Sequence, residues 1–197
     1  MLFKNRSLFA GFGIWVGRIF SRIPLSANAW SLLAIVPACF AFYFLFNHLL
    51  LYAAGATLIA GFLDIIDGAV ARETKTASKQ GAYIDTIIDR YVEGIIILGL
   101  FFVNIPQIIV PTEIVIALYL FGAFMTTYAK SAAKEKELTT KEISGGLIER
   151  AERLLLLVIG LAIGASIPIV FSAILVVLAV LTNVSALQRI RIALSNK

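Results

Sequence analysis

The chain has 197 residues, of which 60% are hydrophobic and only 15% are charged. Soluble domains carry about 25% charged residues, so this composition excludes a water-soluble globular protein. A single cysteine, Cys39, excludes an intrachain disulfide, and the net charge of +5 comes from basic residues sorted along the chain as in membrane proteins, not gathered into a nucleic-acid-binding surface.

Residues 1–23 precede the first long apolar stretch and combine apolar and basic side chains. Phe12, Val16 and further apolar residues recur at helical spacing, whereas Arg18 and Arg22 fall on another side. This pattern predicts a juxtamembrane amphipathic helix that lies in the headgroup plane. The alternative is a short first span interrupted by the two arginines.

Six later stretches have the composition of membrane-spanning helices, which need about 20 mostly apolar residues. They cover residues 27–46, 50–71, 82–103, 113–131, 147–165 and 168–187. The fourth has the weakest apolar character, and no repeat or linker divides the chain. We therefore predict an all-α integral membrane bundle formed by one domain, residues 1–197, with a six-helix transmembrane core over residues 27–187.

The basic residues are sorted to one side of this predicted bundle. All 17 lysines and arginines lie on one face, whereas the loops 47–49, 104–112 and 165–168 contain none. Positive charge in short loops marks the cytoplasmic side of a membrane. We therefore expect a multi-pass protein of the cell membrane with both termini in the cytoplasm. His48 falls in a loop on the opposite side, and we interpret it as an ordinary loop residue.

Two pairs of aspartates stand at the cytoplasmic ends of the second and third spans. Asp64 and Asp67 are three residues apart, and Asp85 and Asp89 are four apart, so each pair projects from one face of its helix. Because a short loop joins the two spans, we expect the four carboxylates to converge near the inner membrane surface. Acidic residues inside spans are costly and usually functional. The pattern therefore predicts an active site on the cytoplasmic side.

Four carboxylates at low dielectric cannot all stay ionised unless cations lie among them. Two Mg²⁺ ions would balance four negative charges, and all-oxygen ligands suit Mg²⁺ or Mn²⁺ rather than zinc. Metal pairs of this kind are typical of phosphoryl chemistry. Nearby, Gly68, Ala71 and Gly81 leave room for a bulky group, and Arg72 suits a diphosphate. Close helix packing alone is the alternative role for Gly81.

Residues 64–89 read D-I-I-D-G-A-V-A-R, eight further residues, then G-A-Y-I-D-T-I-I-D. Every fixed position of D-x2-D-G-x2-A-R-x8-G-x3-D-x3-D is present, and on this motif the chain resembles the CDP-alcohol phosphotransferase family. The chain length and the six-span pattern are similar to that family as well. The resemblance implies a homodimeric enzyme of phospholipid biosynthesis, which transfers a substituted phosphate from a CDP-linked donor to an alcohol and releases CMP.

The resemblance also implies roles for individual residues. Asp64, Asp67, Asp85 and Asp89 would bind two divalent ions, and Asp89 would be the general base that takes the proton of the incoming hydroxyl. The nucleotide and diphosphate site would be lined by Asn28, Gly68, Ala71, Arg72, Ser78 and Gly81.

The stretch that opens the first span departs from the family pattern. The family often has a Pro-Asn pair followed by a hydroxyl residue there, whereas this chain reads Ala27-Asn28 and then Ser31. We interpret Asn28 as a contact to the cytidine, and the N-cap of the first span is an equally natural role for it.

The acceptor alcohol is predicted to bind beside the aspartates, at the basic inner ends of the last three spans. Lys134, Arg150, Arg153 and Arg191 are the candidate ligands of a phosphate on the acceptor. The stretch G-L-I-E-R-A-E-R-L is similar to a segment of phosphatidylinositol phosphate and archaetidylinositol phosphate synthases. This similarity implies a CDP-linked lipid as donor and inositol 1-phosphate as acceptor. Glycerol 3-phosphate, serine and CDP-inositol are alternative substrates, and a solvent- or headgroup-facing position is the alternative for each base.

Two other classes of membrane protein also use intramembrane acids. A transporter would explain the aspartates, but not the glycine, alanine and arginine at fixed offsets from them. A prenyltransferase would use aspartate pairs and Mg²⁺ to bind a diphosphate, but with more spans and different aspartate spacing. Release of CMP in the presence of Mg²⁺ would separate the enzyme from a transporter, and bound CDP would separate it from a prenyltransferase.

Overall fold

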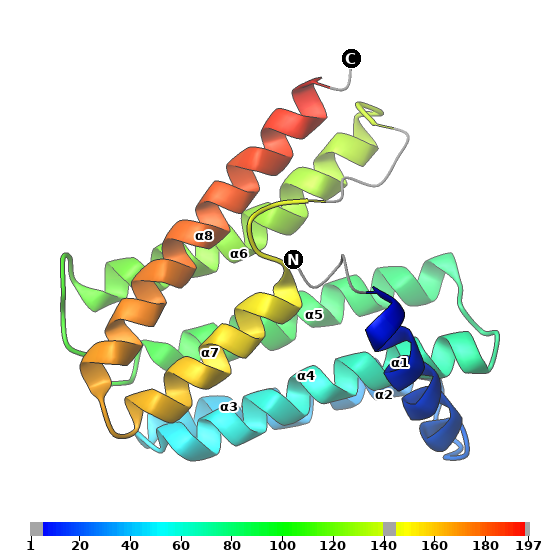
Figure 1. Ribbon diagram of the computed structural model, residues 1–197, viewed down its shortest axis with the longest axis horizontal. Coiled ribbons are helices and arrows are strands. Elements are labelled where there is room, and N and C mark those ends of the chain that lie inside the picture. The colour runs from blue at the N-terminus through cyan, green and yellow to red at the C-terminus, as the bar shows by residue number, and fades with distance from the viewer. Residues whose placement is uncertain (1–5, 140–144, 196–197) are drawn as a thin grey trace. The chain divides into compact units, whose positions relative to one another are not determined.

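The computed structural model describes residues 6–139 and 145–195, and every regular element among them is an α-helix, which confirms the predicted all-α class. The chain divides into two compact units, residues 1–102 and residues 103–197. The first unit holds α1 (Arg6–Phe20), α2 (Ala27–Leu33), α3 (Ile35–Phe46), α4 (Leu50–Glu73) and α5 (Lys79–Leu100), and the second holds α6 (Thr112–Glu135), α7 (Arg150–Gly164) and α8 (Pro168–Ser195) (Figure 1).

Four segments are long and apolar enough to cross a membrane, and they correspond to the first, second, fourth and sixth predicted spans. These segments are Ala27–Phe46, Leu50–Glu73, Thr112–Glu135 and Pro168–Ser195. The helices at the other two predicted spans differ, because α5 carries charged side chains from Asp85 to Glu93 and α7 has only 15 residues. Membrane crossing by α5 and α7 stays a prediction.

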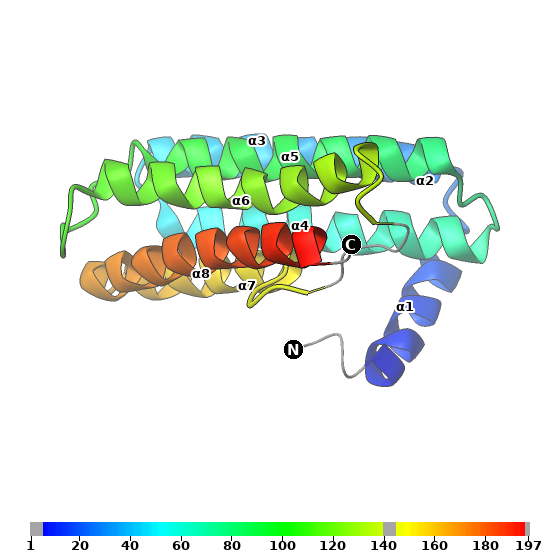
Figure 2. The same cartoon turned by 90° about the horizontal axis from the view of Figure 1, so that it is seen from above.

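The first predicted span consists of two helices, α2 and α3, that follow one another in line (Figure 2). Pro37 explains the break, because proline has no N–H to donate and its ring conflicts with the carbonyl group four residues earlier, at Leu33. Ala34 between the helices keeps a right-handed helical backbone, and its N–H donates to the Ser31 carbonyl oxygen at 3.1 Å. The chain direction is therefore almost unchanged at the break.

In the first unit, α3 packs against both α4 and α5, and α2 also contacts both helices. α1 packs against α4, where Val16 is fully buried in a cluster with Trp30, Ile66 and Val70. A helix is therefore present within the predicted range 1–23, of which residues 1–5 lie outside the described part, and Phe12 is among the apolar residues that it leaves exposed. Its amphipathic character stays a prediction. Its position in the headgroup plane stays a prediction.

In the second unit, α8 packs against both α6 and α7. α6 lies close to α8 at Gly122, where an added Cβ would lie 2.5 Å from the Thr182 Oγ1 atom. The next residue of α8, Asn183, donates a side-chain hydrogen bond to the Leu118 carbonyl oxygen on α6 at 2.8 Å. These polar contacts within an apolar helix pair fix the register in which α6 and α8 present their basic ends.

Candidate active site

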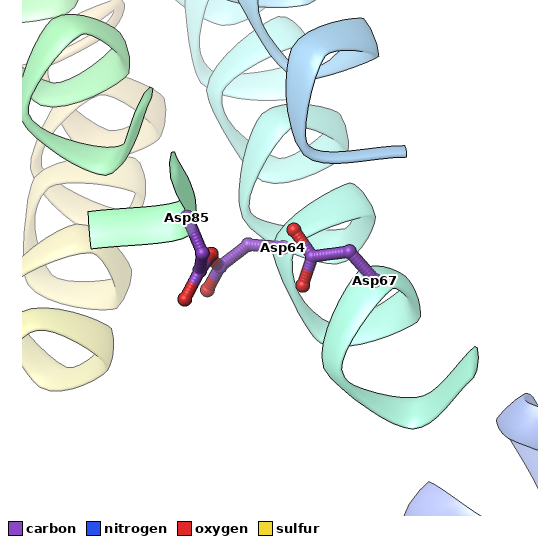
Figure 3. Close-up of side chains that lie close together, drawn as sticks. All are labelled: Asp64, Asp67 and Asp85. Carbon is purple, nitrogen blue, oxygen red and sulfur yellow. The ribbon is translucent and has the colours of Figure 1, made fainter. Parts of the chain in front are cut away.

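Three of the four predicted metal-binding aspartates lie close together. Asp64, Asp67 and Asp85 each bring one carboxylate oxygen within 4.8 Å of the others. α4 supplies the first two from adjacent turns, and α5 supplies the third from a facing turn (Figure 3). Asp89 is not part of this group, although it lies one turn beyond Asp85 on α5 and is half-buried.

The burial of these carboxylates fits a divalent cation. Asp67 is only 5% exposed, and its Oδ2 atom is buried without a hydrogen-bond partner among the described residues. Asp64 and Asp85 are half-buried. A buried carboxylate oxygen that lacks a donor is costly, and a bound cation removes this cost. Three oxygens this close together form the ligand set that Mg²⁺ and Mn²⁺ prefer.

A pocket of about 200 Å³ opens beside Asp67 and Asp85. Its walls come from α2, the C-terminal turns of α4, the loop after α4 and the first turns of α5. The six residues predicted for the nucleotide and diphosphate all line this pocket, and they are Asn28, Gly68, Ala71, Arg72, Ser78 and Gly81. The cluster of three aspartates thus borders a pocket that is lined largely by small residues and by the guanidinium group of Arg72.

Two helix N-termini shape the pocket. Ser26 caps α2 by accepting a hydrogen bond from the Ala29 N–H at 3.2 Å, so the N-cap role considered for Asn28 is wrong. Ser78 caps α5 by accepting from the Gly81 N–H at 3.0 Å. A Cβ at Gly81 would lie 3.2 Å from the Ser78 Oγ atom and 3.3 Å from the Asn28 Oδ1 atom. The missing side chain at Gly81 therefore leaves space between two polar groups of the pocket.

Two polar residues that line the pocket, Ser31 and Thr76, are absent from the predicted site. Ser31 is 4% exposed, and its hydroxyl can donate either to the Asp67 carboxylate or to the Ala27 carbonyl oxygen, 3.3 Å away. A hydroxyl one helical turn after Ala27 was the sequence signal for Ser31. Thr76 lies in the loop after α4, where its Oγ1 atom is 2.8 Å from that of Thr74. No local pattern marks Thr76.

The four predicted acceptor ligands lie in the second unit and differ in burial. Lys134 and Arg191 are exposed, and Arg150 is half-buried at the start of α7. Arg153 is 1% exposed, and its Nη1 atom donates to the Thr126 Oγ1 atom at 3.4 Å. The structure therefore gives these four side chains different degrees of exposure.

Arg189 joins Arg153 at Thr126 and is absent from the predicted set. Its Nη1 atom donates to the Thr126 carbonyl oxygen at 2.8 Å. Arg189 lies one helical turn after Ser185, a fully buried residue whose hydroxyl accepts from the Ile148 N–H at 3.0 Å, and no sequence pattern marks Arg189. Two arginines from α7 and α8 thus converge on one residue of α6.

The comparisons with known proteins all point to one protein family. A profile of the CDP-alcohol phosphatidyltransferase family matches residues 25–185. The archaetidylinositol phosphate synthase of Methanothermobacter thermautotrophicus is 30% identical over 176 residues, which cover 89% of this chain and 86% of that protein. The phosphatidylinositol phosphate synthase of Mycolicibacterium smegmatis is 32% identical over 147 residues, which cover 69% of this chain and 63% of that protein.

Crystal structures of the Mycobacterium tuberculosis phosphatidylinositol phosphate synthase share the fold. The complex with manganese and citrate matches with a TM-score of 0.81 and 24% identity, over 93% of this chain and 89% of that one. The complex with CDP-DAG matches with a TM-score of 0.79 and 24% identity, over 92% of each chain. With its apolar helices and a family profile that spans both units, this chain belongs to the CDP-alcohol phosphatidyltransferase family and is a multi-pass membrane transferase of phospholipid synthesis.

Proposed function

We propose that this protein is a Mg²⁺-dependent enzyme that transfers the phosphate-linked lipid group of a CDP-linked lipid to inositol 1-phosphate. The observation that carries the proposal is the group of Asp64, Asp67 and Asp85 at the edge of the pocket. The names of the archaetidylinositol phosphate and phosphatidylinositol phosphate synthases support the acceptor. CDP-DAG bound in a synthase of the same fold supports the donor.

Different residues of the chain would bind the metal ions and the diphosphate of the donor. Asp64, Asp67, Asp85 and Asp89 would hold two divalent ions, and Mn²⁺ is the alternative ion because a synthase of the same fold binds manganese. When bound, these ions would stabilise negative charge on the diphosphate. The guanidinium group of Arg72 makes no hydrogen bond or ion pair with any described residue, so its N–H groups are available to the diphosphate oxygens.

The transfer step would form one P–O bond and break another. The acceptor hydroxyl oxygen attacks the phosphorus farther from cytidine, and the bond from that phosphorus to the bridging oxygen breaks, so that CMP leaves with the bonding electron pair. Asp89 takes the hydroxyl proton during the attack. The half-buried position of Asp89 outside the group of three suits this role, because a carboxylate shared less with cations is a better proton acceptor.

The phosphate of the acceptor would be bound by Lys134, Arg150, Arg153 and Arg191, and we add Arg189 to this set. Guanidinium groups suit phosphate because their planar fork of N–H donors matches two phosphate oxygens. Arg153 and Arg189 are already oriented by their shared contacts with Thr126. An acceptor phosphate would therefore meet two guanidinium groups whose rotamers are restrained before binding.

We further propose that both units form one domain, because the family profile runs across them from residue 25 to residue 185. The cytoplasmic placement of both termini and of the active site is supported by the sorting of all 17 basic residues. Six spans, an interfacial α1 and a homodimer complete the proposal, the dimer by analogy with the family. Cysteine labelling of residues 4 and 48 from either side of sealed vesicles would test the orientation.

A panel of acceptors tests the function. Purified protein in mixed micelles with a CDP-linked lipid and Mg²⁺ is given inositol 1-phosphate, inositol, glycerol 3-phosphate or serine, and released CMP and labelled lipid are measured. We expect a phosphorylated lipid product with inositol 1-phosphate only, loss of turnover with EDTA, and recovery with added Mg²⁺. Incorporation of glycerol 3-phosphate or serine in place of inositol phosphate would contradict the acceptor, and no CMP release with any acceptor would contradict the transfer.

A further inference from the structure

α2 packs on α4 through apolar side chains that lie next to the aspartate group. Trp30 of α2 is buried in the same cluster as Ile66 and Val70 of α4. The residues that follow Trp30 and Ile66 in the chain, Ser31 and Asp67, are only 4% and 5% exposed. Because a close-packed helix pair does not shift easily, this packing holds a hydroxyl group beside a buried carboxylate.

The Ser31 hydroxyl group has two acceptors within reach and one proton to donate. One acceptor is the Ala27 carbonyl oxygen, one turn earlier in α2, at the long distance of 3.3 Å. The other acceptor is the carboxylate of Asp67. Hydrogen bonds to ionised groups are about twice as strong as those between neutral groups, so an ionised Asp67 is the better acceptor. The Asp67 Oδ2 atom still has no hydrogen-bond partner among the described residues, which leaves it open to a cation.

We infer that Ser31 is a positioning residue, whose hydroxyl group orients the Asp67 carboxylate for the divalent cation proposed at the group of three aspartates. The inference rests on the proposed function, since the cation meant is the Mg²⁺ or Mn²⁺ ion named there. Hydrogen bonds to metal ligands fix the orientation of those ligands and tune metal affinity. Ser31 follows Asn28 by three residues, and both line the pocket. One short helix would thus serve both the nucleotide and the metal ion.

The test compares two buried serines. Ser31→Ala is set against Ser172→Ala, because Ser172 in α8 is also 4% exposed and its hydroxyl donates to the Pro106 carbonyl oxygen at 2.6 Å. Binding of Mn²⁺ to the purified protein in detergent, without nucleotide, is measured by electron paramagnetic resonance. We expect the Kd for Mn²⁺ to rise about tenfold in Ser31→Ala and by less than about twofold in Ser172→Ala.

A conservative variant separates the hydroxyl group from the packing of α2. Ser31→Thr keeps a hydroxyl group at the same position, so its Kd for Mn²⁺ should stay within about threefold of that of the unaltered protein. A Ser31→Thr protein that binds Mn²⁺ as weakly as Ser31→Ala would assign the loss to packing and overturn the inference.

A second measurement separates an effect on the metal ligand from a direct contact with the nucleotide. At saturating Mn²⁺, CDP binding and kcat of Ser31→Ala should return to within about threefold of the unaltered protein, because excess ion offsets the weaker metal site. If Ser31→Ala binds Mn²⁺ normally without nucleotide but binds CDP weakly at saturating Mn²⁺, the hydroxyl group contacts the nucleotide instead, and the inference is overturned.

The outcomes also distinguish this inference from the proposed function. If the unaltered protein binds neither Mn²⁺ nor CDP, the proposed function itself fails. If it binds both and Ser31→Ala binds Mn²⁺ as tightly as Ser172→Ala, only the role of Ser31 is refuted.

Discussion

The aspartates of the first unit and the arginines of the second are placed in opposite electrostatic situations. Asp67 is buried with an oxygen atom that no described residue satisfies, and Asp64 and Asp85 add further negative charge beside it. Arg153 is also buried, but oxygen atoms of Thr126 accept hydrogen bonds from it and from Arg189. The first group could hold a cation from outside the chain, whereas the second is stabilised by hydrogen bonds within the chain.

Substitutions in the two groups should therefore affect activity and stability differently. Removing a charge from the aspartate group relieves repulsion in the folded protein, so it should cost activity but little stability. Removing an arginine leaves oxygen atoms without their donors, so it should affect stability and binding together. The following variants test this distinction, beginning with the largest expected effect.

Asp67→Asn should lower CMP release by about 10³-fold or more, because an amide is a poor ligand for a divalent cation and the diphosphate charge is no longer stabilised. Its thermal unfolding temperature without divalent ions should equal or exceed that of the unaltered protein. Glu135→Gln is the control, since Glu135 is exposed and pairs only with Lys136 at the surface in the described part of the chain. A large loss of stability in Asp67→Asn would contradict the repulsion argument.

Asp89→Asn should lower turnover by about 10²-fold or more while Mg²⁺-dependent CDP binding changes by less than about fivefold, because the base acts on the acceptor and not on the nucleotide. Asp89 lies outside the group of three carboxylates, which makes this separation measurable. CDP binding by isothermal titration and single-turnover CMP release give the two values. Full activity of the variant would remove Asp89 as the general base.

Arg189→Ala and Arg191→Ala compare a positioned arginine with an exposed one, two residues apart on α8. We expect the acceptor KM to rise about tenfold in Arg189→Ala and by less than about threefold in Arg191→Ala, with the donor KM unchanged in both. Steady-state kinetics at saturating CDP-lipid measure this. Equal effects of the two substitutions would show that the contact with Thr126 does not orient the acceptor site.

The smallest effects are expected at the C-terminal ends of α4 and α6. Lys75 and Glu137 follow these helices with φ angles of 56° and 55°, a left-handed conformation that suits glycine. Lys75→Gly and Glu137→Gly should each stabilise the protein by about 0.5–1 kcal/mol, seen as a higher unfolding temperature in detergent. Glu137→Gly should leave activity unchanged. A lower unfolding temperature for both variants would refute the strain at these helix ends.

Much of the first unit could be predicted from local spacing. Asp64, Asp67 and Asp85 lie within one helical hairpin, so helix periodicity and a short loop were enough to bring them together. Asn28 was harder, because it reaches the pocket from α2, and its relation to Gly81 depends on how α2 packs on α5. The N-cap of α2 was also hard to predict, because Ser26 and Asn28 are both good capping residues. Only the backbone conformation shows that Ser26 is the N-cap.

The second unit was less predictable. Thr126, Arg153 and Arg189 come from three helices separated by long stretches of sequence, and no period links them. Arg191 and Arg189 look alike in the sequence, but only one of them lies on the face of α8 that meets α6. Membrane crossing by α5 and α7 was also hard to predict from the sequence, since charge and length alone do not place a helix within a bilayer.

The amino-acid sequence by itself determined the helical class, the apolar segments and the family motif, because these depend on composition and on spacing along one or two adjacent helices. Only the tertiary structure decided which polar atoms of the described residues remain without partners, which arginines meet at Thr126, and which glycines lie where two helices approach closely. Those features depend on distances between helices, and interhelical distances follow from the packing of many side chains at once.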